Sequence, residues 1–262
     1  QVIKSEENRL FYNYLGFIQK RRTLAAPHEA VMTDSTASES AIKKARNILN
    51  GFGGEVATEQ KRILAEHPDM LFAKYLNMIL EPEIPEAPEE IMNKQDLQYR
   101  WYRNHYWDRV DFSDPRLVKD GSFHQILDRF WTRVLPQIPD TLVIEAKRLI
   151  ARTKGNAEMF KYITHYITFA SESSQGMCMD KVFVEMVDTY YSPDQAVWLQ
   201  PEQLKKVQDR ANELRDSMCG NAIPNIVLPD LDQQQWVSLY DVAAKYTVVI
   251  IWESTCGHCK KE

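Results

Sequence analysis

The chain has 262 residues, of which 44% are apolar and 26% charged, and its formal net charge is −5. These values are close to the averages for globular proteins, and they exclude a disordered, collagen-like or membrane-embedded chain. The longest apolar run, residues 248–252, is far shorter than the ~20 residues that cross a bilayer. No block of Lys and Arg stands apart from acidic neighbours, so nucleic acid is not an expected partner.

The first part of the chain, from Ser5 to about Arg215, has apolar residues at three- and four-residue steps in almost every window, which predicts an all-α region. A polar stretch up to Ser40, the glycines within 51–54, and His67-Pro68 are expected to separate its first four helices. The predicted ranges of these helices are 5–22, 42–50, 58–67 and 70–80.

Residues 81–90 contain five glutamates and three prolines and are predicted to form a connector without helix. Helical spacing then resumes, with Ser122 and Thr141 as expected N-caps and Gly155 as an expected stop. No period of 34 to 45 residues is present, which argues against a helical repeat array. The later predicted helices bring the total to about ten, and they cover 92–110, 123–134, 142–150, 160–167, 182–190 and 204–214.

The composition changes at Met218-Cys219-Gly220, where a second domain is expected to begin. A short strand is predicted at 223–228 and a helix of one to two turns at 239–245. Residues 247–252 are β-branched and apolar, which predicts a buried parallel strand. Because 43 residues are too few for an independent α/β core, this second domain is expected to be incomplete.

The strongest chemical signal is Cys256-Gly257-His258-Cys259, directly after the last predicted strand. Four cysteines are too few for a disulfide scaffold, so this pair indicates redox or metal chemistry. A helix N-terminus lowers the pKa of a thiol placed there, which makes Cys256 the predicted nucleophile. Cys259, one turn later, is predicted to resolve a mixed disulfide. Gly257 and His258 are expected to tune the redox potential, with His258 favouring the reduced form.

Four segments in the last 43 residues carry a family resemblance: 220–232, 237–241, 245–252 and 256–260. Together they resemble the opening of the thioredoxin-like thiol-disulfide interchange proteins of bacterial cell envelopes. Three glutamines, 233–235, stand where that family usually has a glycine in the turn.

The upstream segments 99–108, 111–115 and 123–130 resemble the helical domain of unknown function that precedes such modules in lipoprotein-like envelope proteins. In those relatives a small β-rich domain comes earlier, and Gln1-Val-Ile-Lys4 looks like its last strand. The chain opens on Gln rather than Met, and we expect a middle segment cut at both ends. The resemblance therefore implies three parts: a remnant of a β domain at 1–4, a helical accessory domain at 5–217, and an incomplete thioredoxin-like domain at 218–262 that ends just after the CxxC.

The resemblance implies that the parent protein is a thiol-disulfide oxidoreductase of the cell envelope or periplasm. Its partners would be protein thiols or disulfides and a redox partner protein, with no cofactor. In thioredoxin folds a cis-proline loop, a buried acid–base group and the remaining strands follow the CxxC, so we expect this segment to be inactive alone. A rival hypothesis is a non-enzymatic binding or scaffolding module whose helical region recognises a partner polypeptide.

The cysteines allow other interpretations. The CxxC could bind zinc with Cys219 and His258 as further ligands, although His258 lies inside the motif and no second CxxC exists. A peroxiredoxin would need Pro and Thr where Val249 and Glu253 stand. Cys178 and Cys219 could pair in an oxidising compartment, but buried free thiols among the neighbouring methionines are the more ordinary expectation.

One predicted helix holds five aromatic residues that could form a stacking platform for sugar or peptide, although burial on most sides is the more common reason for such a cluster. These residues are Tyr99, Trp101, Tyr102, Tyr106 and Trp107. Nearby, His105, Asp108 and Asp111 could hold a cation. The alternative is that Asp108 pairs with arginines while Asp111 and Asp114 cap the following turn.

Overall fold

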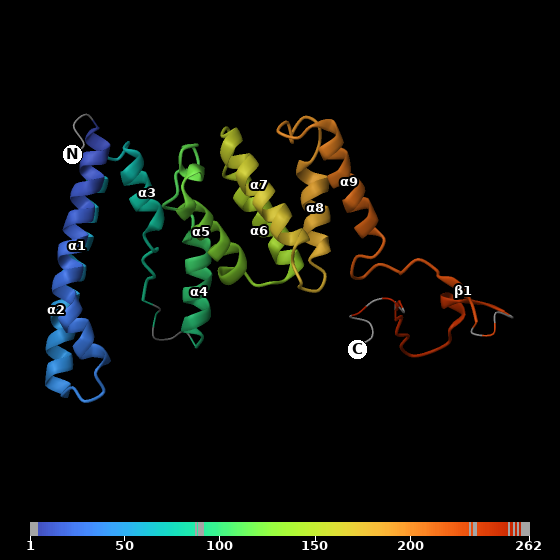
Figure 1. The fold of residues 1–262 in the computed structure, drawn as a ribbon, viewed down its shortest axis with the longest axis horizontal. Coiled ribbons are helices and arrows are strands. Elements are labelled where there is room, and N and C mark those ends of the chain that lie inside the picture. The colour runs from blue at the N-terminus through green and yellow to red at the C-terminus, as the bar shows by residue number, and fades with distance from the viewer. Residues whose placement is uncertain are drawn as a thin grey trace.

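The computed structural model confirms a mostly all-α chain. Its described residues form nine α-helices and a single two-stranded sheet. The helices stand side by side in a row from α1 to α9, and the C-terminal segment extends beyond α9 (Figure 1). No helix in the described part is long and apolar enough to cross a membrane. The structure describes residues 5–86, 88, 92–230, 232, 235–250, 252, 253, 255 and 257.

Helix α1 spans Glu6–Thr33, so the predicted end near Arg22 is wrong. Ser5 caps it as predicted, because its side chain accepts a hydrogen bond from the backbone N–H of Asn8. The helix continues because the residues after Arg22 are mostly good helix formers, including three alanines. Even Pro27 lies inside it. An internal proline costs about 3 kcal/mol, which packing against α2 must offset.

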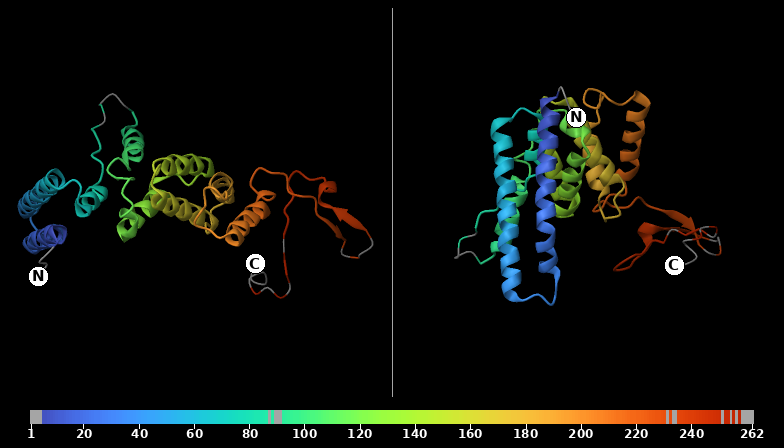
Figure 2. Two further views of the ribbon diagram at one scale, coloured as in Figure 1. Left: turned by 90° about the horizontal axis from the view of Figure 1, so that it is seen from above. Right: turned by 60° about the vertical axis from the view of Figure 1, so that its left-hand side comes forward.

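Helix α2 spans Glu39–Glu66, so the glycines of 51–54 do not end a helix and the two predicted helices are one. A glycine inside a helix costs only about 1 kcal/mol relative to alanine, which tertiary packing can outweigh. Ser38 caps this helix, and an ion pair of 2.9 Å between Arg21 and Glu55 ties it to α1. The two helices form a long antiparallel hairpin (Figure 2).

The predicted helix at 70–80 is confirmed as α3, Leu71–Ile79. It packs against the hairpin through a small core around Ile63, and Phe11 meets Phe72 edge to face at 5.3 Å. The Glu7 carboxylate accepts a hydrogen bond of 2.7 Å from the Phe72 backbone N–H, which satisfies one open donor at the start of α3.

Residues 81–86 contain no helix, as predicted for the connector. The Ser122 N-cap prediction is wrong: the cap is Asp120, whose side chain accepts a hydrogen bond from the Ser122 backbone N–H at 2.7 Å. Likewise α6 begins at Pro139, before Thr141. The later helices are α4 Lys94–His105, α5 Gly121–Arg129, α6 Pro139–Ala151, α7 Ala157–Glu172, α8 Asp180–Tyr190 and α9 Pro201–Arg215, with a 3-10 turn at Leu117–Lys119 and a π-helical turn at Phe130–Val134.

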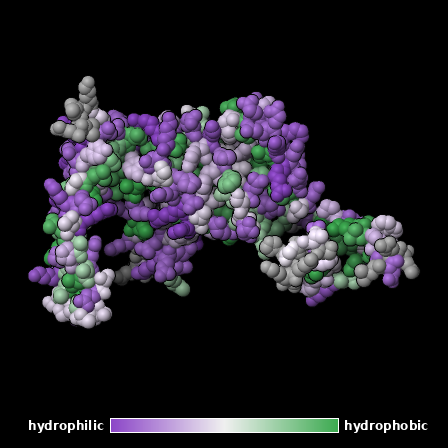
Figure 3. Space-filling view, in the orientation of Figure 1, coloured by the Kyte–Doolittle hydropathy of each residue, from purple (hydrophilic) through white to green (hydrophobic). Residues whose placement is uncertain are grey.

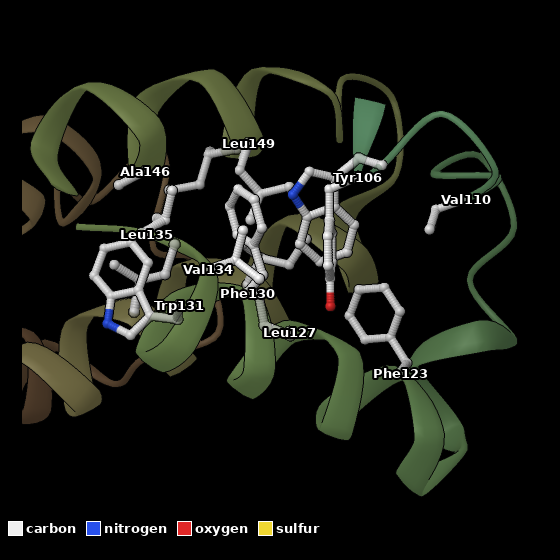
Figure 4. Packing of buried hydrophobic residues seen from close by; sticks show 14 of the residues in the cluster. Tyr106, Val110, Phe123, Leu127, Phe130, Trp131, Val134, Leu135, Ala146 and Leu149 are labelled. Carbon is white, nitrogen blue, oxygen red and sulfur yellow. The ribbon is translucent and has the colours of Figure 1, made fainter. Parts of the chain in front are cut away.

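The main hydrophobic core lies between α3 and α8 and is rich in aromatic side chains. Figure 4 shows Phe130 and Leu127 of the α5 region packed close to Tyr106, with Leu149 of α6 beside them. A second cluster fills the space between α8 and α9. The positions of the helices are therefore set by shared apolar faces.

The sheet near the C-terminus is small. Strand β1, Val227–Pro229, pairs antiparallel with β2, Trp236–Ser238, and a single 3-10 turn follows at Leu239–Asp241. The predicted strand at 223–228 is thus shorter and shifted, and the predicted helix at 239–245 is reduced to that turn.

The predicted buried strand at 247–252 is not formed over its described residues. Residues 247–250 have no regular structure, and Val248 and Ile250 are 82% and 80% exposed. A strand needs a neighbour for its backbone N–H and C=O groups, and no described segment pairs with this one. High β-propensity alone therefore did not produce a strand here.

Candidate functional site

Cys178 and Cys219 form a disulfide, so the expectation of two free thiols is wrong. Cys178 lies just before α8 and Cys219 just after α9, with Cα atoms 5.4 Å apart. Helices α8 and α9 form a helical hairpin, so the start of α8 lies beside the end of α9. The disulfide links these two ends. Asp188 and Arg215 add a two-point ion pair across the same helices, with distances of 2.8 and 2.9 Å.

The methionines next to these cysteines explain why sequence reasoning missed the bridge. Met179 is buried in the main core and Met218 packs against the α8–α9 cluster, which is the apolar setting expected for free thiols. The pairing depends on how α8 and α9 meet, 41 residues apart in sequence, and spacing alone does not reveal that. Cys178 has a φ of 65°, a backbone conformation that side chains seldom adopt.

The CxxC lies mostly outside the described residues. Cys256, His258 and Cys259 are among those not described, so their predicted roles as nucleophile, tuning residue and resolving thiol stay predictions. Gly257 is described and exposed, with no atom within 4 Å of the position its Cβ would take.

The zinc interpretation loses one of its ligands. A cysteine binds zinc as a thiolate, and the sulfur of Cys219 is bonded to that of Cys178. Among the described residues no group of three or more His, Cys, Asp or Glu side chains is placed to hold a metal ion.

The proposed aromatic platform is largely part of the core. Tyr106 and Trp107 are 8% and 4% exposed, so they present no open stacking face. Tyr99 and Tyr102 are only partly exposed, and their hydroxyls donate to the Val134 carbonyl at 2.8 Å and the Glu81 carboxylate at 2.7 Å. Helix α4, Lys94–His105, has no buried residue, so the expected helix buried on most sides is not formed. Full burial is confined to Tyr106 and Trp107, which follow its end, while Trp101 is partly exposed and stacks on the His105 ring at 4.1 Å.

The three residues proposed for a cation are not placed to hold one together: His105 and Asp108 pair with each other, and Asp111 pairs with Lys74. Asp108 accepts a hydrogen bond from the His105 ring at 2.6 Å and lies 3.6 Å from Arg152. Asp111 pairs with Lys74 at 2.8 Å, and it accepts a hydrogen bond from the Ser113 backbone N–H. The alternative of arginine pairing and turn capping is confirmed.

An ion-pair network around one buried carboxylate, next to these residues, was not found from the sequence. The Asp114 side chain is 4% exposed and contacts Arg116 at 2.6 Å and Lys74 at 3.0 Å. The Arg116 guanidinium, with Lys74, holds the pKa of Asp114 well below its usual value, which outweighs the opposite effect of burial. This network fixes α3 to the loop that follows α4. Lys74 lies 40 residues before Asp114, and no local pattern links the two.

These features define a helical protein in which a disulfide links the start of α8 to the end of α9. Residues 34–217, more than half of the chain, match the model of a family described as a domain of unknown function, DUF5106, and the chain belongs to that family. No curated protein and no solved structure matches the chain. The matched range falls within the predicted helical domain, 5–217, and the match does not extend to the CxxC.

Proposed function

We propose that this protein is a thiol-disulfide oxidoreductase of the cell envelope, in which the helical region is an accessory domain to a thioredoxin-like module. The proposal rests chiefly on the pair Cys256 and Cys259, which are separated by Gly257 and His258 directly after an apolar segment. Paired thiols at this spacing are the minimum needed to exchange a disulfide between two proteins.

The disulfide between Cys178 and Cys219 supports the proposed compartment. Disulfides persist in oxidising environments such as the bacterial periplasm and are rare in the reducing cytosol. A protein that carries a disulfide in its scaffold and a CxxC elsewhere fits a compartment in which thiol exchange is needed.

The exposed apolar segment before the CxxC supports the proposed module. Val248 and Ile250 are β-branched and mostly exposed, yet the composition of residues 247–252 is that of a buried parallel strand. In the proposed module, neighbouring strands pair with both edges of this segment and helices cover both faces of the sheet, with Cys256 at the strand's carboxyl end.

The proposed reaction is a two-step exchange. The Cys256 thiolate attacks one sulfur of a client disulfide, which forms a mixed disulfide and releases the other client sulfur as a thiolate. The Cys259 thiolate then attacks the Cys256 sulfur, which releases the second client thiol and leaves Cys256 bonded to Cys259. Two electrons pass to the client, and a partner protein with a dithiol restores the reduced pair. Oxidation of a client is the same sequence in reverse.

Trapping in the complete protein tests the proposal. Cys259→Ser should keep the attack but block resolution, so mixed disulfides with client proteins accumulate and are identified by mass spectrometry after alkylation at low pH. Cys256→Ser should trap nothing. A Cys178→Ser/Cys219→Ser double variant is the matched control, because it removes two cysteines outside the motif and should trap no more than the native protein.

The same experiment separates the proposal from a scaffolding role. If Cys259→Ser and Cys256→Ser capture the same proteins without a disulfide, the helical region binds them and the oxidoreductase proposal fails. Stoichiometric zinc in the purified protein would also overturn it.

A further inference from the structure

A small pocket lies between α4 and α6, at a distance along the chain from every cysteine. Most of the side chains that line it are charged or aromatic. Its volume is about 20 Å³, enough for one water-sized group. Its lining includes Arg103, Trp107, Phe130, Glu145, Arg148 and Arg152.

Two hydrogen-bond donors that belong to this pocket have no partner among the described residues. They are Nε of Arg103 and Nε1 of Trp107, and both atoms are buried. The whole Trp107 residue is only 4% exposed. Both groups can only donate, so a complementary occupant must bring an acceptor. A buried donor without a partner is unfavourable, and such an occupant would relieve this.

The charges around the pocket favour an anion. Three guanidinium groups face one carboxylate, and that carboxylate, Glu145, already pairs with Arg148 at 3.0 Å. Arg152 pairs at 3.6 Å with Asp108, which does not line the pocket. Arg103 makes no ion pair within the part of the chain that the structure describes, so positive charge is left in excess.

The Arg103 side chain is held in place without a carboxylate. Its guanidinium carbon lies 5.9 Å from the centre of the Tyr99 ring, a cation–π contact, and Tyr99 is itself fixed by the hydrogen bond to the Val134 carbonyl. This contact restricts the guanidinium, which reduces the conformational entropy lost when an anion binds.

We propose that this pocket receives one oxygen of a small oxyanion, either a carboxylate or inorganic phosphate, with Arg103 and the Trp107 indole N–H as the donors. Because the volume admits a single oxygen, the rest of the anion lies at the mouth of the pocket. The inference is independent of the CxxC chemistry, since the pocket contains no cysteine. A single bound water is the competing occupant.

Titration of the uniformly ¹⁵N-labelled protein tests the proposal, because the chain has six tryptophans and each indole N–H gives its own signal. Sodium acetate and sodium phosphate are added separately at constant ionic strength, and neutral acetamide serves as the uncharged probe. The Trp107 signal, assigned by its loss in Trp107→Phe, should move and saturate with acetate, with phosphate or with both. The anion that acts at the lower concentration identifies the ligand chemistry.

Variants decide whether the pocket is responsible. Arg103→Gln should weaken anion binding by about tenfold or more, since hydrogen bonds to charged groups are the strong ones. Arg100→Gln on the same helix is the matched control. Its guanidinium pairs with Asp96 at the surface, so binding should be unchanged. Arg152→Gln provides a second test if Arg103→Gln does not fold. The proposal is overturned if acetamide shifts the signal as much as the anions, if no anion moves it, or if the arginine variants bind normally.

Discussion

The helical region and the C-terminal segment are both rich in apolar residues, yet only the first buries them. Ile163 of α7 is fully buried, whereas Ile250 is 80% exposed. Hydrophobic side chains also gather on the C-terminal segment at the right of Figure 3. The reason is the source of the backbone hydrogen bonds: a helix makes its own and then packs, but a strand depends on a neighbour. Apolar composition therefore leads to burial only where a partner element is present.

The largest effect is expected from the bridge at the boundary between the two regions. The disulfide closes a loop of about 40 residues, and in the chain-entropy model it stabilises the fold by about 4 kcal/mol. Cys178→Ser, Cys219→Ser and the double variant should each lose this amount, because any one of them breaks the bridge. Urea unfolding followed by circular dichroism at 222 nm measures it. A double variant that lost the sum of the two single losses would show that the cysteines act separately.

A pair of identical substitutions compares the two regions directly. Ile163→Ala leaves a cavity in the main core and should cost about 3 kcal/mol in the free energy of unfolding. Ile250→Ala removes the same atoms from an exposed side chain and should change it by less than about 0.5 kcal/mol. Both are measured from urea midpoints. Equal losses would mean that the C-terminal segment is buried in solution.

Sequence patterns found the helices of this protein better than their ends. The apolar spacing predicted α3 and the α6–α9 region correctly, because one buried face is a local property that the sequence records. The glycines within 51–54 were misleading, since whether a helix survives them depends on packing between α1 and α2. The disulfide and the Lys74–Asp114 contact join residues about 40 positions apart, so local spacing carries no sign of either.

A smaller effect, dependent on pH, is expected from the buried carboxylate of Asp114. Its folded pKa lies below the unfolded one, so it stabilises the fold fully above the unfolded value, and this stabilisation is lost as pH falls through the folded pKa. Asp114→Asn should therefore lower the free energy of unfolding by about 2 kcal/mol at neutral pH. The difference in this free energy between the variant and the native protein should shrink below about pH 4. The exposed pair Lys205 and Asp209 gives the control, since Asp209→Asn should cost less than about 0.5 kcal/mol. If the difference in unfolding free energy between Asp114→Asn and the native protein stayed constant down to pH 2, the lowered pKa of Asp114 would be contradicted.

The smallest expected effects come from two glycines, one inside the helical region and one at its border with the C-terminal segment. Gly53 lies within α2, and the position of an added Cβ meets no atom within 4 Å, so Gly53→Ala should stabilise the protein by about 0.5 to 1 kcal/mol through better helix propensity. Gly220 has equal space around it but a φ of +90°, which an alanine adopts only with strain. Gly220→Ala should therefore destabilise by about 1 kcal/mol. Because both sites have room for a Cβ, opposite changes in the free energy of unfolding would identify backbone conformation as the cause. If Gly53→Ala instead lowered the urea midpoint, α2 would be interrupted at its glycines, as the sequence pattern first indicated.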